Sequence, residues 1–329
     1  MQRKRILVTG ATGFIGRNLV AAFCKQGYEV VAAASKGRQD VFADKWILGD
    51  ISQVEVQHAA VEGCLFVVNA AGYVNKGESG KDGRERMFRI NSDMPESLAI
   101  ASVHAGVKRF LQISSTGVYG HRAPRVCIES ATCHPKDIYE SSKRAGEERL
   151  AALQNGGMEI VIARPSNVFG EWHPWNKLLS WMKAVQHGKI ILSINPNVTA
   201  VNYVYIQDVV KAIVVLLESP FVMNRDIFNI NTPSSTAEFF QATVRAVGGK
   251  SYAWRVPRIV LTLVASMLDG FSYITGWNFP LTQEKVRELN GSRIFLADRL
   301  TKLYSEFPSI GMEEGLVRLA CHYRNRGLL

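Results

Sequence analysis

The sequence is poor in cysteine, has no block of like charges and contains no apolar run long enough to cross a membrane. Its five cysteines are scattered and form neither a Cys-x-x-Cys pair nor a Cys/His spacing typical of metal ligands. These absences argue against a disulfide framework and a metal site, so we expect free thiols in a reducing cytoplasm. The longest apolar stretch, residues 259–274, carries Asp269 and is shorter than the roughly 20 residues that span a bilayer.

Lys and Arg outnumber Asp and Glu by 39 to 29, which gives a formal net charge of +10. The excess favours an anionic partner, but it does not distinguish a phosphate-bearing small molecule from a nucleic acid or a membrane surface. Because the basic residues are spread along the chain, we expect no nucleic-acid-binding arm. Basic residues precede an apolar run at the N-terminus, as in a secretory signal. Glycines interrupt that run and no Ala-x-Ala site follows, so we interpret it as a buried strand.

The 329 residues are 47% hydrophobic, enough for a large core and two domains. Short β-rich runs alternate with helical periods over the first half. We predict strands at 5–9, 29–33, 45–48, 65–69, 109–113 and 159–163, and helices at 13–26, 53–61, 85–105 and 138–154. The strands are apolar without strict alternation, which is typical of strands covered on both faces. The fold class is therefore α/β, with a doubly wound parallel sheet.

The pattern changes after Pro165, and we place a domain boundary there, between residues 1–165 and 166–329. Turn-rich segments follow, with helices predicted at 177–187, 209–217, 257–274 and 281–289. Residues 203–206 and 227–230 resemble further sheet strands. We therefore expect residues 201–232 to pack back onto the first domain.

Three glycines, Gly10, Gly13 and Gly16, follow the first strand and stand at the start of the first helix. Gly10 permits a sharp turn, Gly13 lets the backbone approach a pyrophosphate, and Gly16 lets helix and sheet pack closely. The N–H groups of the helix end would then hold the phosphates. A tight structural turn is the alternative, but the strand–turn–helix context favours a dinucleotide site.

The end of the second strand indicates which dinucleotide binds. Ala34 stands where NAD sites usually carry a carboxylate for the ribose 2′-hydroxyl. Ser35, Lys36 and Arg38 follow and could hold a 2′-phosphate, although solvated loop residues would look the same. We expect NADP in preference to NAD.

Tyr139 and Lys143 share one face of a predicted helix. A phenol, with an ordinary pKa near ~10, is a poor acid–base catalyst unless nearby cations favour the phenolate. A tyrosine and a lysine on the protein surface, with no catalytic role, could show the same four-residue spacing. Residues 113–120, ISSTGVYG, favour catalysis because they put hydroxyls at the carboxyl edge of the sheet, where such folds bind ligands.

The order of these motifs resembles the extended short-chain dehydrogenase/reductase family, and within it the NAD-dependent epimerase/dehydratase group. The resemblance rests on TGATGFIG, Asp50, NAAG at 69–72, SSTGVYG at 114–120, Tyr139-x-x-x-Lys143 and RPSNVFG at 164–170, and on a similar C-terminal region at 295–316. It implies an NAD(P)-binding Rossmann-type fold, a smaller C-terminal substrate domain and a homodimer with a four-helix contact.

The resemblance also implies residue roles. Tyr139 would be the acid–base residue, and Lys143 would hold the nicotinamide ribose and tune Tyr139. Ser115 would be the catalytic Ser/Thr, with Thr116 as its neighbouring substitute. Asn91 matches the family's helix asparagine, whose role can also be purely structural. The full set expected at the cofactor is Gly10, Thr12, Gly13, Phe14, Ile15, Gly16, Ser35, Lys36, Arg38, Asp50, Ile51, Ala70, Ala71, Gly72, Asn91, Ser114, Tyr139, Lys143 and Pro165.

Family members that dehydrate nucleotide sugars carry a sequence similar to Thr-Asp-Glu at the three positions before VYG. Here Ser115, Thr116 and Gly117 provide no acid, which disfavours dehydration. Asn167 resembles the asparagine that places the substrate diphosphate. Val201 replaces an arginine usual in those enzymes. Arg287 or Arg293 could contact phosphate instead, although surface residues would look the same.

The leading expectation is a nucleotide-sugar 4-epimerase or 4-ketoreductase. The alternative is a 3β-hydroxysteroid-dehydrogenase-like or dihydroflavonol-reductase-like enzyme, which the apolar segment 257–276 favours. A non-catalytic cofactor-binding regulator is the third possibility. Trp172, His173 and Trp175 either line a substrate pocket or belong to an aromatic core.

Overall fold

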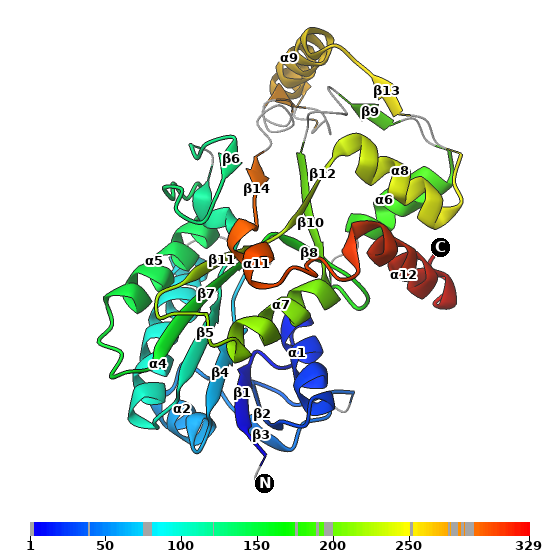
Figure 1. Ribbon diagram of the computed structural model, residues 1–329. Coiled ribbons are helices and arrows are strands. Elements are labelled where there is room, and N and C mark those ends of the chain that lie inside the picture. The colour runs from blue at the N-terminus through cyan, green and yellow to red at the C-terminus, as the bar shows by residue number, and fades with distance from the viewer. Residues whose placement is uncertain are drawn as a thin grey trace.

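Seven parallel strands form the central sheet of the computed structural model (Figure 1). The structure describes all residues except 1–2, 39, 75–80, 121, 175–176, 189–190, 194–199, 251–252, 276, 278–281, 284–285 and 287–292. The sheet order is β11 (Ile227–Ile230), β7 (Glu159–Pro165), β5 (Arg109–Ile113), β4 (Phe66–Asn69), β1 (Arg5–Thr9), β2 (Glu29–Ala34) and β3 (Lys45–Leu48). The strand order reverses beside β1, so the predicted Rossmann-type doubly wound sheet is confirmed.

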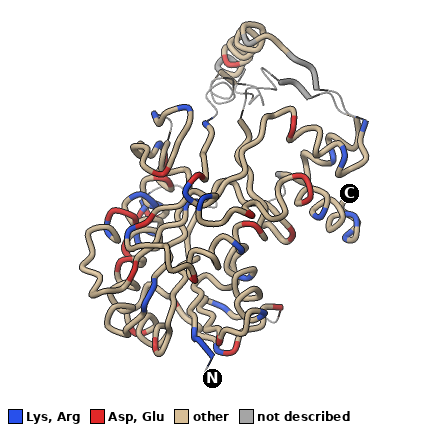
Figure 2. The backbone as a smooth tube through the Cα atoms, viewed as in Figure 1, with Lys and Arg blue, Asp and Glu red and all other residues tan. Residues whose placement is uncertain are grey.

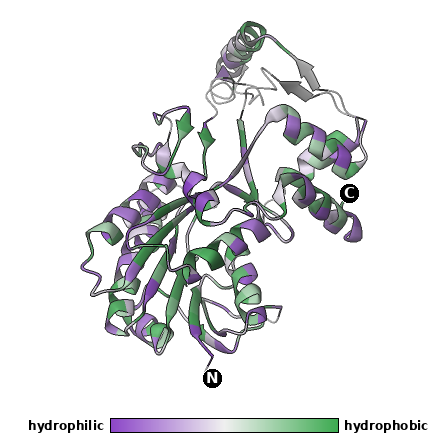
Figure 3. Cartoon of the chain, in the orientation of Figure 1, coloured by the Kyte–Doolittle hydropathy of each residue, from purple (hydrophilic) through white to green (hydrophobic). Residues whose placement is uncertain are grey.

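Helices cover both faces of this sheet (Figure 1). One layer holds α1 (Phe14–Lys25) and α7 (Ile206–Glu218), and the other holds α2 (Val54–Val61), α4 (Met94–His104) and α5 (Ile138–Ala152). Successive residues of β1 enter opposite cores, because Ile6 and Val8 pack with α1 and α7 while Leu7 packs with α2 and α4. The strands are accordingly mostly hydrophobic, with polar residues chiefly toward their ends (Figure 3).

The predicted helix at 85–105 is not one regular helix. It is divided into α3 (Lys81–Phe88), a π-helical segment η1 (Arg89–Asp93) and α4. Pro95 has no N–H to donate to the carbonyl of Asn91, and the N–H of Met94 bonds to Arg89, five residues back. The register of the helix therefore shifts at Asn91.

Residues 203–230 were expected to add two strands to the main sheet, and only one of them does. β11 pairs with β7, but residues 203–205 belong to β10 (Ala200–Tyr205), and Ile206 already starts α7. β10 lies in a separate three-stranded sheet between β12 (Thr232–Ser235) and β8 (Asn167–Phe169). Its Tyr203 ring stacks on Phe239, 5.2 Å between centroids, so aromatic packing draws it away from the central sheet.

The buried guanidinium of Arg109 joins β5 to the C-terminus of α7. It donates to the carbonyls of Leu216 and Leu217 at 2.8 Å and of Ser219 at 3.0 Å. These carbonyls have no partner further along a helix that ends there. Residues from the second half of the chain are therefore part of the sheet's own support.

The remaining elements lie over the carboxyl edge of the sheet (Figure 1). They are η2 (Thr116–Tyr119), β6 (Val126–Cys127), α6 (Lys177–Gln186), β9 (Ile191–Ser193), α8 (Thr236–Val247), β13 (Ala253–Arg255), α9 (Arg258–Thr275), β14 (Ile294–Phe295), α11 (Asp298–Leu303) and α12 (Gly311–Asn325). The helix predicted at 281–289 falls mostly outside the described residues. Within the described part of the chain, every helix is too short or too polar to cross a membrane.

Candidate functional site

The glycine-rich turn joins β1 to α1 in a conformation that only small residues permit. Gly10 has φ +59°, and a Cβ added there would lie 2.8 Å from the backbone of Ala70 and Ala71. A Cβ at Gly16 would lie 2.1 Å from the carbonyl oxygen of Gly10. Gly13 precedes α1, which begins without a side-chain cap and without an acidic residue in its first turn. The N–H groups of this turn are therefore available to a phosphate.

A chain of buried hydrogen bonds links the carboxyl ends of β1, β4 and β5 beside this turn. Thr9 Oγ1 accepts from a backbone N–H of the loop after β4 at 3.1 Å and donates to Asn69 Oδ1. Asn69 Nδ2 donates to Gln112 Oε1 at 2.8 Å. The carbonyl of Ile113 accepts from both Gln112 Nε2, at 3.0 Å, and Lys143 Nζ, at 3.1 Å. Lys143 is thereby fixed to the carboxyl end of β5.

Ser115, Tyr139 and Lys143 converge at this edge. Ser115 Oγ accepts from the N–H of Gly117 at 3.0 Å. Burial raises the pKa of Tyr139 to about 12, an effect that the nearby Ser115 hydroxyl opposes. Burial lowers the pKa of Lys143 to about 8, against the nearby charge of Glu147. In the protein alone Tyr139 is therefore a neutral phenol at pH 7, because burial dominates the shift of its pKa.

Asn91 fastens the loop after β4 to α5. Its Oδ1 accepts from the N–H of Tyr73 at 2.9 Å, and its Nδ2 donates to the Tyr73 carbonyl at 2.8 Å and to Ser142 Oγ at 3.0 Å. A Cβ at Gly72 would lie 3.0 Å from Lys143 Nζ, so this loop passes directly over the lysine. Both ends of the Asn91 amide are used within the protein. Its contacts support the structural role left open by the sequence.

The sequence reasoning missed the buried ion pair that holds α5 against β7. Glu147 binds Arg164 through two hydrogen bonds of 2.8 and 2.6 Å, and both side chains are 2% exposed. The Arg164 guanidinium also lies over the Tyr119 ring, 4.8 Å from its centroid. Arg164 stood in the RPSNVFG motif, and Glu147 repeats the four-residue spacing that joins Tyr139 to Lys143. The four-residue spacing was the signal in the sequence that could have pointed to Glu147.

Three further predicted residues lie close to this edge. Ser114 and Thr116 are buried on either side of Ser115, and Pro165 ends β7. Within the described part of the chain, Ser114 Oγ is buried without a hydrogen-bond partner. Such a hydroxyl can be satisfied by a ligand.

The residues predicted at a 2′-phosphate are exposed beyond β2. Arg38 binds Asp40 through bonds of 2.8 and 2.9 Å, and Arg17 of α1 reaches the same carboxylate at 2.9 Å. The hydrogen bonds from Arg38 and the charge of Arg17 lower the pKa of Asp40. Ser35 and Lys36 are exposed beside them. The guanidinium groups of Arg17 and Arg38 thus both bind the Asp40 carboxylate.

Asp50 and Ile51, predicted at the adenine, follow β3. Asp50 Oδ1 accepts from the N–H and the hydroxyl of Ser52 at 3.0 and 2.8 Å, which lowers the pKa of the carboxyl. Ile51 is half-buried against the core under α2 and α4. The pair thus combines a charged carboxylate with an apolar surface.

On the substrate side, Asn167 and Arg293 are brought together through Asn202. Asn167 Nδ2 donates to the Asn202 carbonyl at 3.0 Å, and Asn202 Nδ2 donates to the Arg293 carbonyl at 2.6 Å. Val201 packs against the core instead of facing this group. Arg287 lies outside the described residues. Of the two candidate phosphate contacts, only Arg293 can be placed, and it lies near Asn167.

Trp172 and His173 pack between α1 and α12. The Trp172 ring has the guanidinium groups of Arg17 and Arg326 over it, 5.6 and 4.9 Å from its centroid. His173 meets Phe14 edge-on at 4.6 Å, beside the glycine turn. Trp172 is nevertheless 53% exposed and His173 is half-buried, so neither lies inside an aromatic core, and Trp175 lies outside the described residues.

A hollow of about 530 Å³ opens beside Tyr139. Its lining includes Val74, Met87 and Phe88 together with the basic residues Arg84 and Lys136. The described residues hold no group of three or more His, Cys, Asp or Glu side chains that could bind a metal ion. The site therefore offers a phenol, a hydroxyl, an ammonium and uncapped N–H groups.

Known proteins share this sequence pattern and fold. The sequence model of the NAD dependent epimerase/dehydratase family matches residues 6–231. The UDP-glucose 4-epimerase of Vibrio cholerae is 30% identical over 265 residues, 77% of this chain and 79% of that protein. The 3β-hydroxysteroid dehydrogenase/Δ5→4 isomerase of Mycobacterium tuberculosis is 33% identical over 176 residues, 50% of this chain and 47% of that protein. The chain thus spans about half the length of several curated relatives.

Among solved structures, the UDP-glucose 4-epimerase of Thermotoga maritima with UDP-glucose superposes with a TM-score of 0.73. It is 21% identical, and the match covers 98% of this chain and 99% of that one. At this identity the structural likeness shows the fold alone. The family match covers most of the chain, from β1 to β11 of the central sheet. The chain therefore belongs to the NAD-dependent epimerase/dehydratase family.

Proposed function

We propose that this enzyme transfers hydride at a sugar carbon of a nucleotide sugar, as a 4-epimerase or a 4-ketoreductase. The observation that carries the proposal is the junction of Ser115, Tyr139 and Lys143 beside the glycine turn, with Gly117 where a dehydratase would need an acid. The relation to an epimerase over 79% of that protein's length supports the same reaction class.

The residues fit a dinucleotide. Gly10 and Gly13 leave the uncapped end of α1 open to a pyrophosphate, and the lack of a side chain at Gly72 leaves room beside Lys143 for a ribose. Asp50 and Ile51 would hold the adenine. When bound, NAD(P) supplies the hydride acceptor and donor.

The proton chemistry belongs to the side chains. Tyr139 exchanges a proton with the sugar hydroxyl, and the nearby Ser115 hydroxyl helps to position that oxygen. Lys143, one helical turn from Tyr139, is held by the Ile113 carbonyl and would contribute positive charge to the site. Because burial keeps the pKa of Tyr139 at about 12, the phenol is the acid form that a ketone reduction requires.

We propose NADP as the preferred cofactor. Arg38 and Arg17 already bind one carboxylate, Asp40, so the same two donors suit a 2′-phosphate of like charge. The absence of an acid at Ala34 favours the same choice. Asp40 competes for these donors, and Asp40→Asn should therefore increase NADP affinity.

We place the substrate diphosphate near Asn167 and Arg293. The Oδ1 atom of Asn167 and the remaining N–H groups of Arg293 would face it. We assign residues 1–165 with 201–232 to the cofactor-binding domain and the rest of 166–329 to the substrate domain. The family resemblance further supports a homodimer, and the scattered cysteines support a location in the cytoplasm; light scattering and cell fractionation would test these proposals.

An apolar ring substrate is the second candidate, supported by the match to a steroid dehydrogenase and by the apolar α9. Competition experiments separate the two functions. If the diphosphate assignment holds, UDP, GDP, dTDP or CDP competes with substrate, and Asn167→Ala raises KM more than it lowers kcat. If none of these nucleotides binds the cofactor-loaded protein while a steroid alcohol is oxidised, the apolar-ring function replaces the first.

Tyr139→Phe tests the reaction itself. Removal of the phenolic proton should lower turnover by about 10²–10⁴-fold, with cofactor affinity nearly unchanged. Retention of a tenth of the activity or more would remove Tyr139 from this role. Ser141→Ala, at a lining position of the same hollow, is the matched control.

A further inference from the structure

Helix α9 exposes an apolar face to solvent. It is 18 residues long and projects from the end of the molecule opposite the N-terminus (Figure 1). Its large exposed side chains, with their exposed fractions, are Ile259 (70%), Val260 (43%), Leu263 (60%), Val264 (41%), Met267 (76%) and Phe271 (53%). Patches of this kind on a protein surface mark contact sites.

The opposite face of α9 is occupied. Leu261 and Ala265 are buried with Val286 in a small cluster of their own, and Asp269 accepts a hydrogen bond from the N–H of Gln283 at 3.0 Å. The helix is therefore oriented by its inner face. The outer apolar face is a fixed feature, because turning it inward would expose Leu261 and Ala265.

The outer face carries no charge. At about 100° per residue, the exposed positions from Ile259 to Phe271 span about 140° of the helix circumference. The charged residues of α9, Arg258 and Asp269, lie outside this arc. A surface helix of a globular protein normally places charged residues there. The arrangement is that of a helix whose apolar side enters the boundary between lipid headgroups and acyl chains.

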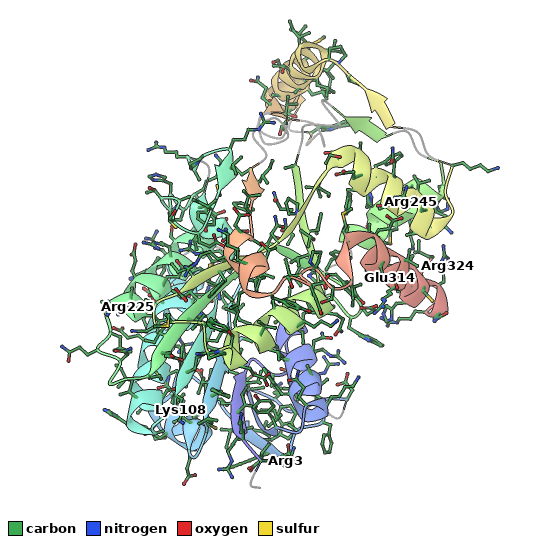
Figure 4. The ribbon with its side chains drawn as sticks, in the orientation of Figure 1. Arg3, Lys108, Arg225, Arg245, Glu314 and Arg324 are labelled. Carbon is green, nitrogen blue, oxygen red and sulfur yellow. The ribbon has the colours of Figure 1, made fainter. Side chains whose placement is uncertain are left out.

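The charge around α9 complements an anionic surface. Residues 239–268 contain four basic residues, Arg245, Lys250, Arg255 and Arg258, and no acidic one. The whole chain carries a net charge of +10, and Figure 2 shows further basic residues on loops at the same end of the molecule. Basic residues beside an apolar helix face attract phospholipid membranes of negative charge. Of these four residues, Arg245 lies on α8 (Figure 4) and forms an ion pair of 2.6 Å with Glu313, whereas the Lys250 side chain is exposed.

We propose that α9 docks the enzyme onto an anionic phospholipid surface. The apolar face inserts in the plane of the membrane, and the basic sequence that precedes the helix attracts the negatively charged headgroups. About 27 Å of helix, at 1.5 Å per residue, would lie along the surface. This proposal does not depend on which substrate the enzyme takes.

Vesicle flotation of the full-length protein tests the proposal. Vesicles of phosphatidylcholine with phosphatidylglycerol should carry the protein upward, whereas vesicles of phosphatidylcholine alone should carry less, and added salt should release it. Met267→Glu should lower the bound fraction about tenfold to a hundredfold, since one inserted apolar side chain is lost. Leu263→Glu, at the preceding turn, should do the same.

Ser266→Glu is the matched control, because Ser266 is exposed on the same helix about a quarter turn from Met267. It should leave flotation within about twofold. Circular dichroism and unchanged turnover of a soluble substrate check that each variant is folded. Failure of the wild-type protein to float, or equal loss in Ser266→Glu, would overturn the proposal. A protein dimer that Met267→Glu dissociates without any flotation would instead assign the face to a second copy of the chain.

Discussion

Replacement of Lys143 by methionine should stabilise the cofactor-free protein at pH 7 while abolishing turnover. Lys143 is 6% exposed, and burial lowers its pKa from 10.5 to about 8. A difference of about 2.5 between folded and unfolded pKa values corresponds to about 3 kcal/mol of unfolding free energy. The ammonium therefore destabilises the fold by about that amount wherever it is charged in both states.

The pH dependence has a definite sign. Below pH 8 both the folded and the unfolded protein carry the proton, and the folded state bears the full penalty. Between about 8 and 10.5 the unfolded state binds more protons, so wild-type stability rises with pH across this window. Methionine has a similar length and no charge. The stability advantage of Lys143→Met should thus be about 3 kcal/mol at pH 7 and shrink toward zero above pH 10.5.

The substitution leaves no buried acceptor without a partner. The Ile113 carbonyl keeps its bond from Gln112 Nε2, and Glu147 keeps Arg164. Urea unfolding of cofactor-free protein at pH 7 and pH 10 measures the difference. Lys108→Met, at the exposed amino end of β5 (Figure 4), is the control and should change stability by less than about 0.5 kcal/mol at either pH. Destabilisation of Lys143→Met at pH 7, or a gain that does not vary with pH, would refute the reasoning.

Gly16→Ala forces a Cβ to within 2.1 Å of a backbone oxygen. It should lower the free energy of unfolding in urea by about 1–3 kcal/mol and weaken cofactor binding. In the control Gly270→Ala the new Cβ meets no atom, so this variant should be neutral or stabilising. Glu147→Gln leaves a buried guanidinium without its counter-charge and should cost about 3 kcal/mol or more, against less than about 0.5 kcal/mol for the exposed Glu148→Gln. Arg38→Ala should weaken NADP binding about tenfold to a hundredfold in calorimetry and leave NAD binding unchanged. A clear NAD preference of the unaltered protein would contradict that last expectation.

The central sheet was predictable because its strands are buried on both faces. Their continuous apolar runs stand out from the helices, and the glycine turn marks where the first strand ends. Residues 203–205 show the limit of this reasoning. They have the same β-forming composition as residues 227–230, and the choice of sheet depends on packing against Phe239, which is distant in sequence.

The motifs of the candidate site could be predicted from the sequence, but the buried contacts that hold them in place could not. Tyr139, Lys143 and Ser115 carry recognisable spacings, whereas the pairing of Glu147 with Arg164 joins residues whose contact depends on how α5 lies on β7. The π-helical turn at Asn91 likewise depends on one missing N–H, at Pro95, and on the close approach of α5 at Gly146. Sequence periodicity alone cannot place such a shift.

The position of β11 at the sheet edge bears on how the chain folds during synthesis. Residues 227–230 emerge from the ribosome long after β7, so the nascent sheet presents an unpaired edge strand while the intervening segments are made. The Arg109 guanidinium likewise lacks its hydrogen-bond acceptors until the end of α7 has been synthesised. Exposed strand edges invite pairing with other chains. A fragment that ends near residue 170 would carry most of the cofactor and catalytic motifs and still be prone to aggregation, because its sheet is completed only by residues beyond it.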